Sequence, residues 1–356
     1  MGIGWDMSRL QGKHVGLALL SVFNIVGNGC LIFTITRHKH LRTVTNVLIT
    51  SLAVADFLFG FPAAPLYILA ETLDGQVVGG DWLSRICLVA MSLTSFQVVI
   101  TVAMVFVITL ERYVCILHPL KHRKWWAEPF NVRLVIILLW LYASIFLLMP
   151  LAGWNALDHY NSDNNNNNNS NDSNSTENCT TFTKCSVLTI QTGQYIATVF
   201  YVNIVPACIT MPILYARMFR AVRQFLVRKA SNGLTHHSSR RSRHQDSHDI
   251  HREIVRRVSR RSLRLLVVIL VNFLCSWLLI FIWYVVATRG FTITYMTSAR
   301  IDHIPIPVVF YDVAANLGYA HSALNPYIYG LGNVRIRKAF IRMVKTRTCR
   351  TSLCRR

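Results

Sequence analysis

Seven long apolar stretches run along the chain, and polar segments separate them. Each stretch has the roughly 20 residues that an α-helix needs to cross the hydrocarbon core of a bilayer. They cover residues 15–36, 44–70, 85–113, 132–154, 194–219, 262–287 and 304–330. Strands of a membrane barrel would be about 10 residues long with alternating polarity, unlike these stretches. The pattern therefore predicts an all-α membrane protein, a bundle of seven transmembrane helices.

The polar segments complete the predicted organisation. From residue 335 onward, basic and apolar residues recur at helical spacing, which predicts a short amphipathic helix on the inner membrane surface. Segment 161–181 is rich in Asn and Ser and is expected to be disordered, whereas 220–261 is rich in Arg, His and Ser and is expected to be a flexible loop. The expected parts are a short N-terminus (1–14), the seven-helix domain (15–334), and the helix with its tail (335–356).

Composition supports a membrane protein, and the distribution of charge gives its orientation. Hydrophobic residues make up 53% of the chain and charged residues only 15%, against about 25% charged residues in an average soluble domain. The net charge is +21, yet 31 of the 37 Lys and Arg residues lie on one side of the predicted membrane. Basic loops of helical membrane proteins stay in the cytoplasm. We therefore expect membrane lipids and not nucleic acid as a partner, an extracellular N-terminus and a cytoplasmic C-terminus.

Glycosylation signals agree with this orientation. All four Asn-x-Ser/Thr sequons lie between the fourth and fifth stretches, on the side predicted to be extracellular. Sugar is attached at such sequons in exposed extracellular segments. The candidate glycosylation sites are Asn168, Asn171, Asn174 and Asn178.

Cysteine positions predict a disulfide at the outer rim of the bundle. Cys87 and Arg112 lie 25 residues apart, which places them about 37 Å apart along a helix, at opposite ends of the third stretch. A cysteine at the extracellular rim lies in an oxidising compartment and is expected to have a partner. Cys179 and Cys185 are the candidates, and Cys185, 21 residues before Pro206, is favoured.

A set of short motifs occurs in fixed order, distributed over the stretches. Charged residues among them lie inside the membrane, where a charge needs a partner or a function. The motifs are Gly27-Asn28, Leu52-Ala53-Val54-Ala55-Asp56, Glu111-Arg112-Tyr113, Trp140, Pro206 and Asn325-Pro326-x-x-Tyr329. As a set they resemble the rhodopsin-like (class A) G-protein-coupled receptors. The resemblance implies a plasma-membrane receptor that binds an extracellular small molecule or short peptide and activates a heterotrimeric G protein.

The resemblance also implies roles at the cytoplasmic end and along the bundle. Arg112 would bind the C-terminal helix of Gα once that end opens, and Glu111 would hold Arg112 until then. Leu120 would enter a hydrophobic pocket of Gα, and Trp277 with Phe273 would form an aromatic switch below the ligand. The coupling and switch positions are Glu111, Arg112, Tyr113, Leu120, Phe273, Trp277, Asn325, Pro326 and Tyr329.

Asp56 resembles the sodium-coordinating aspartate of the family, and oxygen-rich surroundings suit a hard cation. Its expected neighbours are Asn28, Gln97, Thr101, His321, Ser322 and Asn325. His321 stands where the family usually has Asn. One hypothesis is that protonated His321 pairs with Asp56 and competes with sodium. The alternative is a neutral His321 that is hydrogen-bonded within the bundle. Apart from this possible Na⁺ ion, no cofactor or metal site is expected.

The ligand pocket is constrained mainly by exclusion. Amine receptors carry an Asp on the third span where this chain has Thr94, and opsins carry a Lys where it has Tyr319. Segments 150–155 and 217–225 resemble adenosine receptors, but Val187, Tyr284 and Tyr319 differ from the purine-binding residues of those receptors. The candidate pocket residues are Thr94, Gln97, Trp277, Tyr284, Asn316 and Tyr319.

Three alternatives and one modification complete the expectations. Leu279 occupies the usual proline position of the sixth span, so the common cause of a helix kink is absent there and a non-signalling decoy or scaffold receptor is an alternative. A transporter is less favoured because no internal repeat is visible. An enzyme is not expected, because the sequence shows neither a His cluster with metal-ligand spacing nor a nucleophile with a base. Cys349 and Cys354 are candidate palmitoylation sites.

Overall fold

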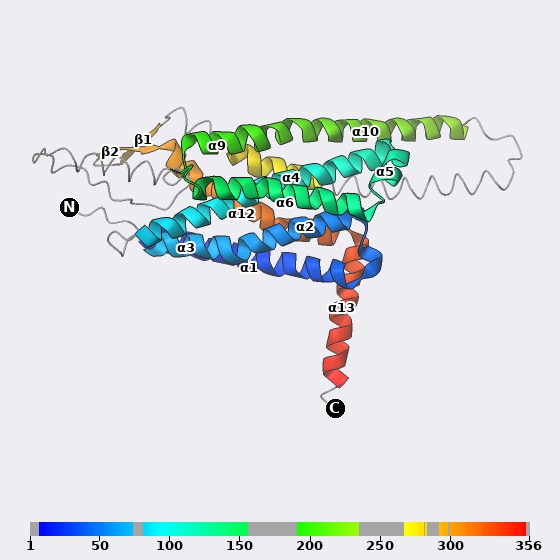
Figure 1. Ribbon diagram of the computed structural model, residues 1–356, viewed down its shortest axis with the longest axis horizontal. Coiled ribbons are helices and arrows are strands. Elements are labelled where there is room, and N and C mark those ends of the chain that lie inside the picture. Colours follow the sequence, from blue (N-terminus) through cyan, green and yellow to red (C-terminus); the bar gives the residue numbers. More distant parts are fainter. Residues whose placement is uncertain are drawn as a thin grey trace, which may run out of the picture.

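The computed structural model describes residues 7–73, 81–155, 191–234, 267–280, 282, 292–297 and 300–353. Long helices dominate this part of the chain and lie roughly side by side (Figure 1). Those that form the first four spans are α1 (Met7–Arg37), α2 (Val44–Leu58) with α3 (Ala64–Leu73), α4 (Asp81–Leu117) and α6 (Pro129–Leu151). The last three comprise α9 (Gly193–Val199) with α10 (Val205–Leu234), the helix Val267–Ile280, and α12 (Ile306–Gly332).

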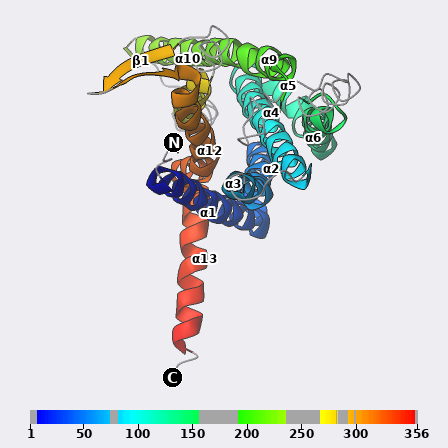
Figure 2. The ribbon, with the colours of Figure 1, turned by 90° about the vertical axis from the view of Figure 1, so that its left-hand side faces the viewer.

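The predicted helical bundle is confirmed. Five of its helices are long and apolar enough to cross a membrane, and the sixth predicted span is described over Val267–Ile280 as a shorter apolar helix. The seventh is α12, in which polar residues such as Asn316, His321 and Asn325 interrupt the apolar ones. Helix α4 occupies the centre, packed against α2, α3, α6 and α10, and α1 packs against both α2 and α12 (Figure 2).

The two ends of the bundle differ. The N-terminal side carries an antiparallel hairpin of β1 (Thr292–Thr297) and β2 (Arg300–Pro305), which the sequence analysis did not predict. The other end carries α5 (Pro119–Trp125) and α13 (Val334–Leu353). Helix α13 leaves the bundle nearly at right angles to its long axis (Figure 1). This direction suits the predicted amphipathic helix, because a helix lying on the membrane runs perpendicular to one that spans it.

Apolar side chains cover the outside of the bundle, whereas many polar ones are buried. Exposed large apolar residues run along α1, α6 and α10, and α6 shows this most clearly with Ile137, Leu138, Leu141, Ile145 and Leu148. Within lipid, polar groups must be satisfied by other protein groups. The buried polar residues are therefore the part of the structure most relevant to function.

Several boundaries differ from those predicted. Helix α10 continues to Leu234, so the first part of the predicted flexible loop 220–261 is helical, because its Arg, Gln, Leu and Lys residues are good helix formers. Helix α6 ends at Leu151 and not at 154, because Gly153 adopts a left-handed conformation (φ 108°). Helix α13 continues to Leu353 and takes up most of the segment predicted as a short helix with a tail, and α1 begins at Met7 within the predicted N-terminal segment.

Local sequence explains other boundaries. Thr43 and Thr192 cap α2 and α9, because each hydroxyl accepts a hydrogen bond from a backbone N–H in the first helical turn. Two π-helical turns, η2 (Phe59–Ala63) and η3 (Phe200–Ile204), lie where Pro62 and Pro206 interrupt the second and fifth spans. A proline lacks the N–H that the α-helical ladder needs, so the helix adjusts locally.

Some sequence-based expectations concern residues outside the described part. These are segment 161–181, the sequons at Asn168, Asn171, Asn174 and Asn178, the cysteines Cys179, Cys185 and Cys354, and Tyr284. Cys87 is disulfide-bonded, and its pairing with Cys185 stays a prediction.

The close contact between α1 and α12 depends on Gly27. A Cβ atom at this position would lie 2.8 Å from Pro326 Cγ and 3.1 Å from Tyr327 Cε2. Small residues let membrane helices approach closely, because lipid provides no hydrophobic drive for their association. Gly27 therefore sets the distance between the first span and the Asn-Pro-x-x-Tyr motif.

We expect Gly27→Ala to lower the free energy of unfolding by about 1–3 kcal/mol relative to Gly16→Ala, because the added methyl overpacks this interface. Gly16 lies on the same helix and has no atom within 4 Å of a built Cβ, so it controls for helix propensity. Thermal unfolding in detergent measures both variants. Equal melting temperatures would show that the α1–α12 contact tolerates the methyl.

Candidate functional site

A buried carboxylate joins three helices in the middle of the bundle. Asp56 on α2 is fully buried. Its Oδ1 accepts hydrogen bonds from Gln97 Nε2 and, at 3.4 Å, from Thr101 Oγ1, both on α4. Its Oδ2 accepts one at 3.0 Å from Asn325 Nδ2 on α12, and Gln97 Nε2 also reaches Ser322 Oγ at 3.3 Å. Four of the predicted neighbours of Asp56 are thus gathered around it.

Asn28 lies one step further away. Its amide donates to Asn24 and, at 3.4 Å, to the carbonyl of Ser322. Asn24, which the sequence analysis missed, donates to the backbone carbonyl of Asp56 at 2.9 Å. Its position one turn before Asn28 on the same face of α1 was the signal that could have identified it.

Two acceptor oxygens of this polar network lack a donor among the described residues. Gln97 Oε1 and Asn28 Oδ1 are buried and have no hydrogen-bond partner among the described residues. The Asp56 side chain has only neutral partners there. A buried carboxylate without a cationic partner is costly. Carboxylate, amide and hydroxyl oxygens are also the ligands that hard cations prefer.

His321 does not contact Asp56 in this structure. Its Nδ1 lies 3.1 Å from Asn272 Nδ2, and its ring packs against Phe273 and Trp277 with centroid distances of 6.2 and 6.1 Å. An amide nitrogen can only donate, so Nδ1 accepts and carries no proton. The sequence left two arrangements of His321 open, and this one is the neutral, hydrogen-bonded arrangement. Asn272, the partner, was missed because it lies on a different span.

Glu111 organises the end of the bundle that carries α5 and α13. It is 1% exposed, and its Oε2 lies 3.0 Å from Arg112 Nε and accepts a hydrogen bond from Thr45 Oγ1 at 3.0 Å. Its Oε1 lies 2.8 Å from His122 Nε2 on α5. Glu111 therefore holds Arg112, as the resemblance implied, and it also connects α4 to α2 and α5. Thr45 and His122 were not singled out from the sequence.

Further residues that the resemblance assigns to coupling have the following surroundings. Leu120 on α5 is 83% exposed, which leaves its side chain available at the surface. Tyr113 packs edge-on against His118. Tyr329 is buried, and its hydroxyl has no partner among the described residues. Near it in the chain, Pro326 packs against α1 as described above.

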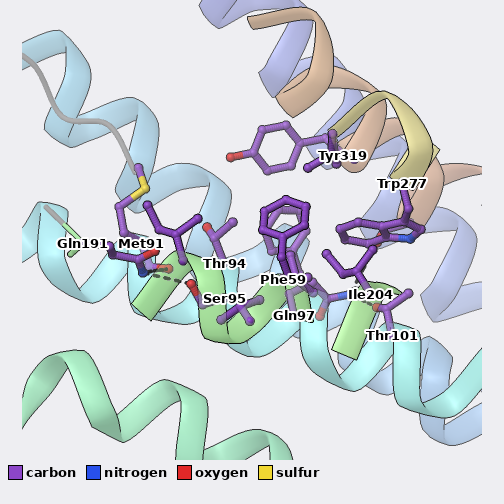
Figure 3. Close-up of a pocket in the computed structure, with 17 residues that line it drawn as sticks. Phe59, Met91, Thr94, Ser95, Gln97, Thr101, Gln191, Ile204, Trp277 and Tyr319 are labelled. Atoms are coloured by element: carbon purple, nitrogen blue, oxygen red, sulfur yellow. Dashed lines mark hydrogen bonds between the residues drawn. The ribbon is translucent and has the colours of Figure 1, made fainter. Parts of the chain in front are cut away.

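A pocket of about 130 Å³ lies between the spans, and the part of α4 from Met91 to Thr101 forms one of its walls. A single water needs only about 10–15 Å³ by this kind of measure, so the space is much larger than a solvent site. Four of the candidate ligand-binding residues, Thr94, Gln97, Trp277 and Tyr319, line it, whereas Asn316 is not among its lining residues. The Tyr319 ring stacks on Phe59 at 5.0 Å, with Trp277 at one end of the pocket and Gln191 at the other (Figure 3).

Gln191 is the most informative pocket residue that sequence reasoning missed. Its Nε2 donates to Ser95 Oγ at 2.8 Å and to the Met91 carbonyl at 3.2 Å. It therefore fixes the segment before α9 against α4. A polar residue directly before the Thr192 cap was the local signal, but its partners on α4 lie almost a hundred residues away in the chain.

Comparison with known proteins gives the family. Residues 27–329 match the family model described as "7 transmembrane receptor (rhodopsin family)". The chain therefore belongs to the rhodopsin family of seven-transmembrane receptors. It is a multi-pass plasma-membrane protein of a receptor family and not an enzyme.

Individual relatives are distant and diverse. The chain is 31% identical over 144 residues to neuropeptide Y receptor type 4 of Mus musculus, which is 40% of this chain and 36% of the relative. It is 28% identical over 151 residues to the probable G-protein coupled receptor No9 of Amphibalanus amphitrite, 42% of this chain and 30% of the relative. Melanopsin-B of Xenopus laevis is 28% identical over 142 residues, which is 39% of this chain and 25% of the relative. The matches span about a third or less of these relatives and point to no single ligand.

Because His321 is neutral and bonded to Asn272, we expect His321→Asn to leave the pH dependence of thermal stability unchanged between about pH 6 and 8, where an ordinary histidine titrates. The melting temperature of both proteins over this range is the measurement. If the melting temperature of the wild-type protein depends on pH and His321→Asn removes this dependence, the result would favour the proton-dependent pair of His321 with Asp56.

Proposed function

We propose that this chain is a ligand-activated receptor that activates heterotrimeric G proteins, with its N-terminus extracellular and its C-terminus cytoplasmic. The observation that carries the proposal is the Glu111–Arg112 ion pair at the end of α4. This ion pair lies at the opposite end of the bundle from the pocket, beside an exposed Leu120. A G protein would need Arg112 free, so the ion pair corresponds to a resting state.

A series of packed residues connects the pocket to the polar core around Asp56. Trp277 lines the pocket and packs on Phe273 and His321. His321 contacts Asn272, whose amide also reaches Asn325 at 3.5 Å, and Asn325 contacts Asp56. A ligand that binds an altered arrangement of Trp277 more tightly would shift the population of the whole bundle toward it.

The pocket favours an uncharged small molecule. Among the described residues, the lining side chains are neutral, with Thr94 where amine receptors carry an Asp. Trp277 Nε1 is buried and has no partner among the described residues, so one donor is available to a ligand. A ligand with an acceptor at this point would satisfy it. Purine nucleosides have this character, and the adenosine-type segments 150–155 and 217–225 make them the first class to test.

A sodium ion at Asp56 is a second part of the proposal. The carboxylate, the Thr101 hydroxyl, and the oxygens of Gln97 and Asn28 that lack a partner in the described part of the chain form a donor set that suits a small hard cation. The ion would supply the positive charge that the described surroundings of Asp56 lack. It would stabilise the arrangement in which α2, α4 and α12 are held together.

Non-signalling binding is the alternative function. The helix Val267–Ile280 is uninterrupted through Leu279, where the family usually has the proline of a kink. An outward swing of the sixth span has no proline hinge there. A decoy or scaffold receptor would bind its ligand without activating a G protein.

We expect the wild-type melting temperature to rise when choline chloride is replaced by sodium chloride at equal ionic strength, because sodium binds only the folded state. Asp56→Asn keeps the size of the side chain and removes its charge, so it should abolish the difference between the two salts. A sodium effect of the same size in Asp56→Asn would place the ion elsewhere.

We expect Arg112→Ala to abolish G-protein activation in cells, both basal and stimulated by a library that starts with purines and amines. The control is Arg37→Ala, which removes an exposed charge at the same end of the bundle but away from α4. Surface amounts are matched by antibody against an N-terminal tag. A wild-type protein that reaches the surface and is silent with every G protein would favour the decoy.

A further inference from the structure

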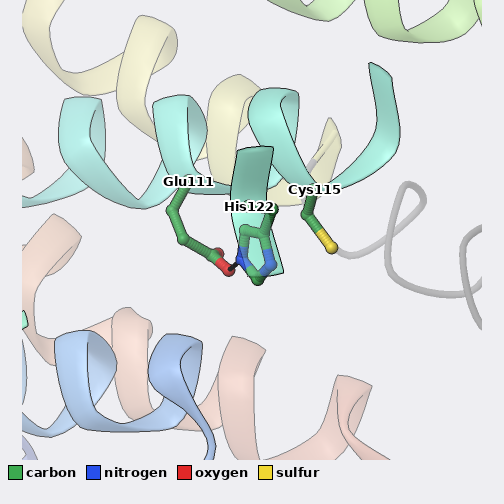
Figure 4. A group of neighbouring side chains, drawn as sticks. All are labelled: Glu111, Cys115 and His122. Carbon is green, nitrogen blue, oxygen red and sulfur yellow. Dashed lines mark hydrogen bonds and ion pairs between the residues drawn. The ribbon is translucent and has the colours of Figure 1, made fainter. Parts of the chain in front are cut away.

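Three metal-binding side chains converge where α5 meets α4. Glu111 and Cys115 lie four residues apart on α4, so they share one face of the helix. His122 approaches the same face from α5. One potential ligand atom from each residue lies within 4.8 Å of the other two. The His122 ring lies between the Glu111 carboxylate and Cys115 (Figure 4).

We propose that Glu111, Cys115 and His122 form a binding site for a zinc ion. Thiolate, imidazole and carboxylate are the ligands that zinc uses in proteins, at about 2.0–2.3 Å. Tetrahedral coordination at those lengths puts neighbouring ligand atoms roughly 3.3–3.8 Å apart. The three side chains would therefore close around the ion through small rotations, and the fourth position is left for water.

The surroundings of Glu111 leave one of its oxygens for the metal. Arg112 and Thr45 both contact Oε2 at 3.0 Å and fix the orientation of the carboxylate. Oε1 faces His122, and its 2.8 Å contact with Nε2 would open by about half an ångström to admit the ion. The His122 ring also stacks against Trp126 with 18° between the planes. Such outer contacts hold metal ligands in place.

Access and charge also suit a divalent ion. Glu111 is buried, but the His122 side chain is 20% exposed and Cys115 is half-buried, so the site opens toward the solvent on that side. Binding would release the thiol proton, and any proton on His122, to solvent. The thiolate and the carboxylate then balance the two positive charges of zinc, while Arg112 keeps its contact with Oε2.

Zinc is the metal of choice for this mixed set. A thiolate with an imidazole favours zinc over magnesium or calcium, which prefer oxygen ligands alone. Sequence reasoning expected no metal site, because His122 belongs to a separate helix and its distance from Cys115 matches no compact zinc motif. The proposal stands on the contacts of α4 with α5 and is independent of the proposed signalling.

The test measures zinc binding by the full-length purified protein in nanodiscs, by titration against a chromophoric zinc indicator. We expect Cys115→Ser and His122→Gln each to lose one zinc equivalent. The matched controls are Cys208→Ser, another half-buried free cysteine, and His118→Gln, which lies just before α5. Both controls should keep the wild-type stoichiometry. Cobalt should give a thiolate charge-transfer band that Cys115→Ser lacks.

A second measurement works on the wild-type protein and so does not depend on how the variants fold. Zinc should slow the alkylation of Cys115 by a thiol reagent, followed by mass spectrometry of the peptide that contains it. His122→Gln, checked for an unchanged melting temperature without metal, should lose this protection. Equal stoichiometry in all five proteins, or alkylation of Cys115 that zinc leaves unchanged, would overturn the proposal.

Discussion

The high cost of a polar group in lipid is the constraint on which this structure depends. Asp56 satisfies it by accepting hydrogen bonds from α4 and α12 while it is carried by α2. The contact between α1 and α12 lies beside this network, since Asn28 and Asn24 on α1 reach Ser322 and the backbone of Asp56. One carboxylate therefore helps to position four of the helices.

The same constraint explains why the buried groups form a continuous path. Several buried side chains in the bundle have their partners on other helices, and these hydrogen bonds join two spans. Asn272 links His321 to Asn325, and Asn325 links that pair to Asp56. A rearrangement of Trp277 at the pocket would disturb contacts that extend toward the centre of the bundle.

Glu111 has a similar connecting role at the end of the bundle that carries α5 and α13. Its two oxygens serve different partners, Arg112 and Thr45 on one and His122 on the other. A change at α5 therefore reaches Arg112 through a single side chain. The carboxylate that pairs with Arg112 through one oxygen therefore presents its other oxygen to His122.

Much of the fold and part of the site could be predicted from local pattern. Span positions follow from runs of apolar residues, because the bilayer sets their length. Gln97, Thr101, Ser322 and Asn325 were assigned to Asp56 through a resemblance to a family whose motifs fix these positions. The predicted helix boundaries were less accurate, because helices such as α10 extend beyond the apolar stretch, where hydropathy gives no signal. The β1–β2 hairpin depends on pairing between strands that no apolar pattern marked.

The sequence by itself determined the class, the spans, the basic side and the residues able to carry chemistry, because these depend on composition and on spacing along one helix. Only the tertiary structure decided which partner each buried group has. His321 could face either Asp56 or the sixth span, and packing placed it against Asn272. Cys115 and His122 became neighbours because α5 turns back beside α4. Contacts of this kind join different helices, and the distance along the chain does not encode them.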